Sequence, residues 1–182
     1  MSDLAQSTNM AAELRAAFDQ TFGLPFLSQG ADLREDLLAI RLGGNAYAIK
    51  VREISGLANN RKIIALPSAI PELLGVAGIR GELVPVYSLA ALMEVNRGSE
   101  EDRWLALCGT DEPIGLAFTD FEGYLQVPFA DLYAASQENV TQRHVKQVAR
   151  TGDLVRSLIS IPAIVETIRT RCGQDGTSSN KR

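Results

Sequence analysis

The chain has 182 residues, is 46% hydrophobic, and carries a formal net charge of −4 from 22 acidic and 18 basic side chains. A chain of this length and hydrophobic content can bury the core of one domain, or of two small barrels that share a core. The acidic balance argues against nonspecific binding to nucleic acid, because such binding draws most of its affinity from cationic side chains that neutralise phosphates.

The cysteines, the first residues and the apolar runs indicate the cellular compartment of the protein. Cys108 and Cys172 lie far apart and form no CxxC motif, so a reducing compartment fits best. The first residues lack the basic and apolar regions of a signal peptide. No apolar run approaches the roughly 20 residues that a membrane-spanning helix needs. We therefore expect a cytoplasmic protein without direct membrane insertion.

Residues 1–33 differ from the rest of the chain and are predicted to be a helical N-terminal extension. Met10, Leu14 and Phe18 recur at helical spacing among alanines, and Gly23 and Pro25 end this pattern. The resulting short amphipathic helix can pack on its own domain or bind a partner, and both alternatives stay open.

From Leu37 onward the pattern is that of strands. Leu38, Ile40 and Leu42 alternate with other residues, residues 43–45 (Gly-Gly-Asn) supply a tight turn, and the alternation resumes from Tyr47 to Val51. Alternation on both sides of a glycine turn predicts a β-hairpin.

Residues 76–87 are predicted to form two strands that bend around Gly78 and Gly81. Pro85 suggests an edge position, because proline cannot donate to a sheet. Ser88 precedes residues 89–93 and is expected to cap a short helix.

A second set of strands follows a polar connector. We predict strands at 104–108, 114–118, 121–127, 145–150 and 154–159, and a C-terminal helix from Ser160 to Arg171. Residues 130–143 stay ambiguous, and the tail at 173–182 has the composition of a flexible linker. The pattern places the β-rich domain at 34–172.

One short internal repeat supports two related halves. Gly81-Glu-Leu-Val is followed by Ser88 and a helix, and Gly152-Asp-Leu-Val is followed by Ser160 and a helix. Two similar β units are the simplest reading of this repeat.

The sequence offers no constellation for catalysis, for a metal or for another cofactor. His144, the one histidine, has no recognisable nucleophile or carboxylate partner and is expected to be a solvated loop residue. One histidine and two distant cysteines cannot supply a tetrahedral zinc site. The glycines at 75–81 lie among strand-forming residues with no helix start after them, so a phosphate cradle is not expected. We predict that the protein is not an enzyme.

The stretch from Leu74 to Leu89, LGVAGIRGELVPVYSL, resembles the CheW-like family of chemosensory adaptor proteins. The hairpin around Tyr47, the residues at 114–116 and 122–123, and those at 148–150 match the family pattern in the correct order. The resemblance covers about three-quarters of the chain.

This resemblance implies an all-β fold with short helices, built from two SH3-like β-barrel subdomains and completed by the C-terminal helix. It also implies a non-catalytic adaptor that couples chemoreceptors to a CheA-type histidine kinase in a bacterial signalling array. The expected partners are the regulatory domain of the kinase and the cytoplasmic tip of the receptor. A CheW-like scaffold that serves motility, polarity or gene regulation is the alternative.

The resemblance carries over residue by residue to Ile54, Gly75 and Arg80, and it departs at Gly56, where the family commonly has an acidic residue. Gly75 and Arg80 are expected beside the groove that holds the receptor, and Ile54 and Gly56 at the barrel end that meets the kinase. A guanidinium can bind carboxylates or carbonyls of a partner helix through directional hydrogen bonds. The other interpretation of Arg80 is an internal ion pair that holds the two barrels together.

Overall fold

The computed structural model describes residues 33–96, 101–109, 112–135 and 143–175 of the chain. The predicted helix around Met10, Leu14 and Phe18 lies outside these residues, as does the end of the tail. Both therefore remain predictions.

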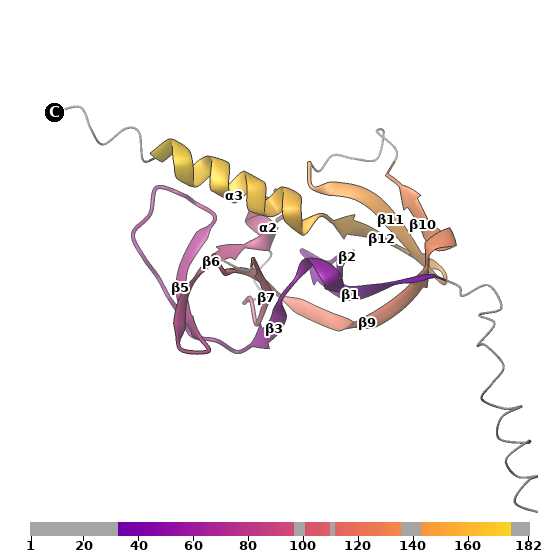
Figure 1. Cartoon of the computed structure of the whole chain (residues 1–182), viewed down its shortest axis with the longest axis horizontal. Coiled ribbons are helices and arrows are strands. Elements are labelled where there is room, and N and C mark those ends of the chain that lie inside the picture. The colour runs from indigo at the N-terminus through magenta and orange to yellow at the C-terminus, as the bar shows by residue number, and fades with distance from the viewer. Residues whose placement is uncertain (1–32, 97–100, 110–111, 136–142, 176–182) are drawn as a thin grey trace, which may run out of the picture. The chain divides into compact units, whose positions relative to one another are not determined.

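Strands dominate the described part of the chain, and α3 is the long helix beside them, whereas α2 is short (Figure 1). In chain order the elements are β1 (Arg34–Leu42), β2 (Asn45–Lys50), the 3₁₀ turn η1 (Val51–Glu53), β3 (Gly56–Asn59), β4 (Ile63–Ile64), β5 (Leu73–Ile79), β6 (Glu82–Ser88), α2 (Leu89–Leu92), β7 (Trp104–Cys108), β8 (Ile114–Phe118), β9 (Asp120–Pro128), η2 (Phe129–Asp131), β10 (Leu132–Ala134), β11 (Val145–Thr151), β12 (Leu154–Ile159) and α3 (Ile161–Asp175). The expectation of an all-β fold with a C-terminal helix is confirmed.

The strands form two six-stranded sheets with the same internal order. The first runs β9-β1-β2-β12-β11-β10 and the second β3-β7-β8-β6-β5-β4. Each contains one parallel pair at the equivalent place, β2 with β12 and β6 with β8. The short repeat in the sequence therefore indicates two barrel units with the same topology. The chain forms β1 and β2 of the first unit, then all strands of the second unit, and then returns to the first unit with β9 to β12.

The turns of the predicted hairpins form where glycine permits a left-handed backbone. Gly43 and Gly44 have φ values of +54° and +82°, which are those of a type I′ turn, and they join β1 to β2. In the second sheet Gly81 has φ +88° and closes the hairpin of β5 and β6.

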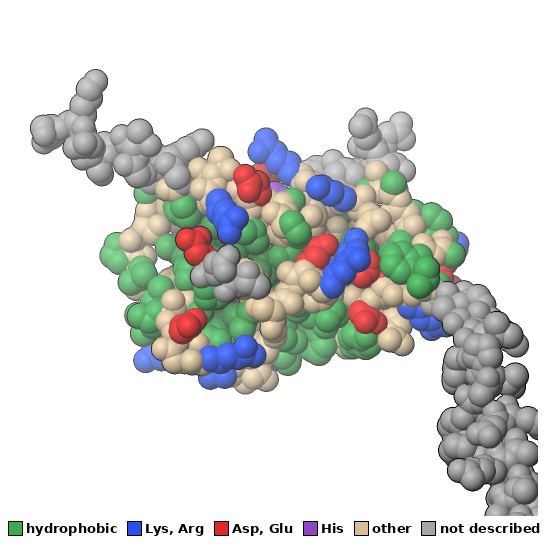
Figure 2. Space-filling view, in the orientation of Figure 1, with side chains coloured by type: hydrophobic (Ala, Val, Ile, Leu, Met, Phe, Trp, Pro, Cys, Tyr) green, Lys and Arg blue, Asp and Glu red, His purple; other side chains and the backbone are tan. Residues whose placement is uncertain are grey.

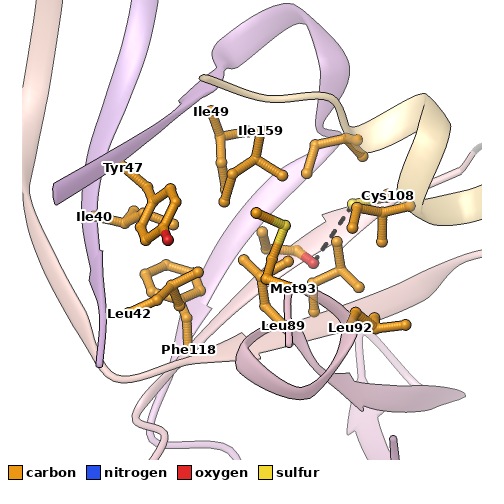
Figure 3. Close-up of a cluster of buried hydrophobic side chains, with 14 of the residues drawn as sticks. Ile40, Leu42, Tyr47, Ile49, Leu89, Leu92, Met93, Cys108, Phe118 and Ile159 are labelled. Atoms are coloured by element: carbon orange, nitrogen blue, oxygen red, sulfur yellow. Dashed lines mark hydrogen bonds between the residues drawn. The ribbon is translucent and has the colours of Figure 1, made fainter. Parts of the chain in front are cut away.

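One core cluster connects the two sheets, as Figure 3 shows. Its fully buried members include Ile40 and Ile49 of the first sheet, Phe118 of the second, and Met93 after α2. Each large apolar side chain that is fully removed from water contributes roughly 1.5–3 kcal/mol. This shared core makes the two barrels one body.

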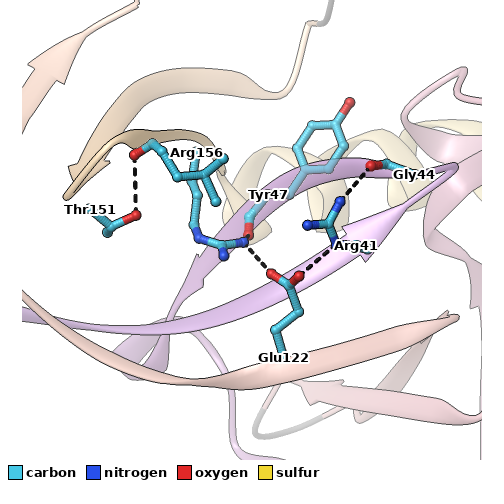
Figure 4. Close-up of polar contacts among 7 residues, drawn as sticks. Arg41, Gly44, Tyr47, Glu122, Thr151 and Arg156 are labelled. Carbon is cyan, nitrogen blue, oxygen red and sulfur yellow. Dashed lines mark hydrogen bonds and ion pairs between the residues drawn. The ribbon is translucent and has the colours of Figure 1, made fainter.

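An ion-pair network fastens β9 to its neighbours (Figure 4). Glu122 Oε1 accepts from Arg41 Nε of β1 at 2.5 Å, and its Oε2 pairs with Arg156 Nη1 of β12 at 2.6 Å. Arg156 is buried and also donates to the Tyr47 carbonyl at 3.5 Å. Glu122 therefore links three strands that are distant in sequence.

Two strand assignments differ from expectation. Pro85 is not on an edge strand, because β6 lies between β5 and β8. It is tolerated there because the pairing with β8 begins only at Val86. The segments of β3 and β10 were not predicted as strands, since they are short and gain their hydrogen bonds from β7 and β11.

Candidate functional site

Arg80 occupies the two-residue turn between β5 and β6, with φ +53° beside φ +88° at Gly81. These values describe a type I′ turn, a conformation that residues other than glycine adopt rarely. The side chain is exposed. It forms no hydrogen bond or ion pair with any residue that the structure describes. Within that part of the chain, the interpretation of Arg80 as an internal strut between the barrels has no support.

Arg80 and Gly56 lie on the same surface. A Cβ built on Gly56 would stand 3.7 Å from Nη2 of Arg80 and 3.6 Å from Cδ1 of Leu107. Ile54 precedes Gly56 by two positions, directly after η1, and packs in part against the shared core. We call Ile54, Gly56 and Arg80 the end surface. Gly56 and Arg80 are expected at separate partner surfaces, and the structure places them side by side, because the guanidinium reaches over the start of β3.

Gly75 is buried and does not join this surface. Its φ is +143°, and a Cβ there would stand 2.0 Å from the backbone oxygen of Ile64. The pairing of β5 with β6 shifts between Leu73 and Gly75. Gly75 therefore shapes the backbone beneath β4 and presents no side chain to a partner.

A hollow of about 610 Å³ lies between α3 and the second sheet. Leu83, Pro85, Tyr87 and Ile114 line the sheet side, and Val165 and Ile168 line the helix side. We call it the α3 groove. None of the four predicted site residues lines it. The spacing of Val165, Ile168 and Cys172 along one helix face is the sequence signal that could have suggested it.

Charged side chains flank the apolar floor of this groove. Glu82 and Glu112 stand on the sheet side, and Arg169 stands on the helix. A second hollow of about 350 Å³ shares Val165 and Arg169 with the first and extends along α3 to Glu53. The recess therefore follows the helix for several turns.

Both ends of α3 are fixed to the body of the protein. At its start the amide of Ile161 donates to Glu53 Oε2 at 2.9 Å, where a carboxylate also complements the helix dipole. Near its end Arg171 forms an ion pair with the buried carboxylate of Glu72. These contacts hold α3 in place along one side of the groove. Glu53 is the last residue of η1, so its hydrogen bond to Ile161 links α3 to the segment that contains Ile54.

His144 is buried, with 7% of its surface exposed, so the expectation of a solvated loop residue is wrong. Burial lowers its pKa, and the positive charges of Arg171 and Arg143 lower it further. Its Nδ1 has no hydrogen-bond partner among the described residues. The fold brings His144 under α3 through the pairing of β11 with β12, which the sequence around it does not indicate.

The described residues contain no group of three or more His, Cys, Asp or Glu side chains placed to hold a metal ion. Nor do they contain a helix with the length and apolar character of a membrane span.

Comparisons with known proteins agree with this fold. A family model described as the CheW-like domain matches residues 36–169. Chemotaxis protein CheW of Bacillus subtilis is 19% identical over 136 residues, which cover 72% of this chain and 87% of that protein. The crystal structure of scaffolding protein TtCheW from Thermoanaerobacter tengcongensis is similar with a TM-score of 0.63 and 14% identity, and covers 70% of this chain and 89% of that one.

Proposed function

The chain belongs to the CheW-like domain family, and on this premise we propose that it is a non-catalytic adaptor that joins the cytoplasmic tip of a chemoreceptor to the regulatory domain of a CheA-type histidine kinase. The coarser role, that of a chemotaxis scaffold, follows from the family and from the names of the similar proteins. The two specific partners and a cytoplasmic location are part of the proposal.

The observation that supports the proposal is that the end surface and the α3 groove are different parts of one body with a shared core. An adaptor must hold both partners at once, so the two sites cannot coincide. The end surface lies at the start of β3, whereas the groove lies along α3. The common core and the fixed ends of α3 hold these surfaces in one geometry.

We assign the receptor tip to the α3 groove. The floor is apolar and elongated, which suits an amphipathic helix that buries residues spaced three and four apart. Glu82, Glu112 and Arg169 at the rim can fix the direction and register of such a helix.

We assign the kinase domain to the end surface. Arg80 offers a guanidinium without an internal partner among the described residues, held on a tight turn. Ile54 supplies apolar contact area beside it. Gly75 supports this surface only indirectly, through the backbone of β5. Each interface can be weak by itself, because an array gains avidity from repeated contacts.

The test uses two charge reversals of equal size, Arg80→Glu and Arg169→Glu, since both side chains are exposed. Thr170→Glu, also on an exposed part of α3 but outside the groove lining, is the control. Binding of a kinase regulatory domain and of a receptor tip fragment is titrated for each variant. We expect Arg80→Glu to weaken the kinase alone and Arg169→Glu the receptor alone. Equal loss of both partners by both folded variants would reject the two-surface model, and wild-type protein that binds neither partner would favour a different signalling pathway.

A further inference from the structure

The outer face of β4, β5 and β6 is apolar, and at Leu83 and Pro85 it borders the α3 groove. Residues that pair across the three strands form rows. One row consists of Ile64 of β4, Val76 of β5 and Pro85 of β6, and the next row on this face pairs Gly78 of β5 with Leu83 of β6. Because alternate residues of a strand share a face, these two rows point the same way. Ala77 and Val84 point inward and are buried.

The exposure of this face is large for apolar side chains. Leu83 is 73% exposed and Ile64 is 55% exposed, and Leu66, just beyond β4, is 46% exposed. At its centre Gly78 has no side chain, and a Cβ built there would meet nothing within 4 Å. The face is therefore open over Gly78, with Leu83 beside it in the register. In Figure 2 hydrophobic side chains are exposed over the half that holds β5 and β6.

Cations border the same face. Arg61 and Lys62 directly precede β4, and Arg80 lies in the turn between β5 and β6. The Asn60 amide donates to the Arg103 carbonyl at 2.9 Å, which brings Arg103 to this end of the sheet. Figure 2 shows Lys and Arg side chains along the lower edge of this half.

These positive charges lack internal compensation. Arg61, Lys62, Arg80 and Arg103 are exposed, and none forms an ion pair with another residue that the structure describes. Glu82 stands in the same hairpin without pairing with Arg80. Together these four side chains give this end a local excess of positive charge, in a chain of net charge −4.

We propose that this face, the cationic platform, docks an acidic protein surface that places a large apolar side chain over Gly78 and carboxylates against Arg61, Lys62 and Arg80. The inference rests on the proposed function, because it takes the partner to be the kinase regulatory domain, which is assigned to the end surface that shares Arg80, and adds the chemistry of its contact surface. An apolar centre within a charged rim is the usual anatomy of such an interface.

A protein partner accounts for the platform better than an anionic lipid surface. Three of the four cations are arginines, whose planar guanidinium matches a fixed carboxylate in a bidentate pair. Arg80 is held in place by its type I′ turn, which favours a partner of defined geometry. Polybasic segments that bind lipid rely on nonspecific attraction and usually carry more lysines.

The test compares two double charge reversals. Arg61→Glu with Lys62→Glu changes the platform, and Lys146→Glu with Arg150→Glu makes the same charge change on exposed residues of β11 in the other barrel. A third variant, Ile64→Ser, removes exposed apolar area without touching the lining of the α3 groove. Each is titrated with a kinase regulatory domain, a receptor tip fragment and phosphatidylcholine vesicles containing phosphatidylserine, at low and high salt.

We expect the platform reversal to weaken binding of the kinase regulatory domain by at least about tenfold at low salt and to flatten its salt dependence. Ile64→Ser should weaken the same partner without changing that dependence, and the β11 reversal should leave binding unchanged. Loss of the receptor tip alone would overturn the inference. Protein partners that bind the wild type and the platform variants equally would overturn the inference and leave the proposed function intact. Vesicle binding that the platform reversal abolishes, with protein binding unchanged, would overturn it in favour of lipid. Wild-type protein that binds neither protein partner would overturn both proposals.

Discussion

The guanidinium of Arg80 lies 3.7 Å from the point where a Cβ on Gly56 would stand. Gly56 is the first residue of β3, and Arg80 lies in the turn between β5 and β6. Because Gly56 has no side chain, there is room for the arginine side chain above β3. Arg80 is therefore directed toward β3 while it has no carboxylate partner among the described residues.

A carboxylate at position 56 should occupy Arg80 and weaken binding at the end surface. Gly56→Asp places its Cβ at ordinary contact distances, so the fold should tolerate it. Partner binding should fall by about 1–3 kcal/mol, because losing an interface arginine has that order of effect. Gly56→Asn has the same shape without the charge and is the control. In an Arg80→Ala background Gly56→Asp should add little, and a titration that finds the two effects additive would argue against a direct pair.

Gly75 and Gly78, in the same strand, should respond oppositely to alanine. Gly75→Ala forces a Cβ to 2.0 Å from a backbone oxygen at φ +143°, and should destabilise the protein by at least about 2 kcal/mol. Gly78→Ala meets nothing within 4 Å and should leave stability nearly unchanged. Chemical denaturation of both variants measures the difference. Equal stability would contradict the close packing of β4 on Gly75.

Gly81→Val should destabilise the hairpin through backbone conformation alone. No atom lies within 4 Å of the Cβ position, but φ is +88°, which a β-branched residue adopts only with strain. We expect a loss of about 1–3 kcal/mol. Gly81→Asn should lose less, because asparagine tolerates the left-handed region. Thermal melts of the pair test this, and an unchanged melting temperature for Gly81→Val would exclude the type I′ turn.

Glu122→Gln should reduce stability at neutral pH by roughly 1–3 kcal/mol, the range for hydrogen bonds to charged groups. Burial by itself would raise the pKa of Glu122, but the hydrogen bonds from Arg41 and Arg156 outweigh it and lower the pKa below 4.5. A carboxyl with a depressed folded pKa stabilises above its unfolded pKa and loses that contribution as pH falls through the folded value. The difference in unfolding free energy between wild type and Glu122→Gln should therefore shrink below about pH 4.5. A difference that does not change with pH would show that the network acts through packing only.

His144 should make the protein less stable as the pH falls below neutrality. Its folded pKa lies below 6.5 because of burial and of the charges on Arg171 and Arg143, while a weaker effect of Glu94 acts in the other direction. The unfolded chain then binds the proton more readily, so stability declines as pH falls from 6.5 toward the folded pKa. His144→Gln should remove this decline. Denaturation curves of both proteins between neutral and mildly acidic pH check it, and parallel curves would mean that His144 is open to water.

Local patterns in the sequence predicted the parts of the fold that neighbouring residues control. Alternation about Gly43 and Gly44 predicted the first hairpin, and the observed φ values explain why glycine stands there. Ser88 was expected to cap α2, and its Oγ accepts from the Ala91 amide at 3.3 Å. The repeat at Gly81 and Gly152 marked two hairpins that occupy equivalent places in the two sheets. Turns, caps and alternation depend on a few consecutive residues, so the sequence by itself determined them.

The site depended on contacts between distant segments, which only the tertiary structure decided. Gly56 meets Arg80 because β3 pairs with β7 while β4 pairs with β5, and no pattern in one strand reveals its partner. Gly75 was expected at a surface but is covered by β4, and the α3 groove exists because Glu53 and Glu72 hold the helix against the second sheet. Strand order and helix docking are set by the burial of one shared core, which sums many weak contributions over the whole chain. A side chain's neighbours across such a core are therefore fixed by the fold as a whole and not by the residues beside it in sequence.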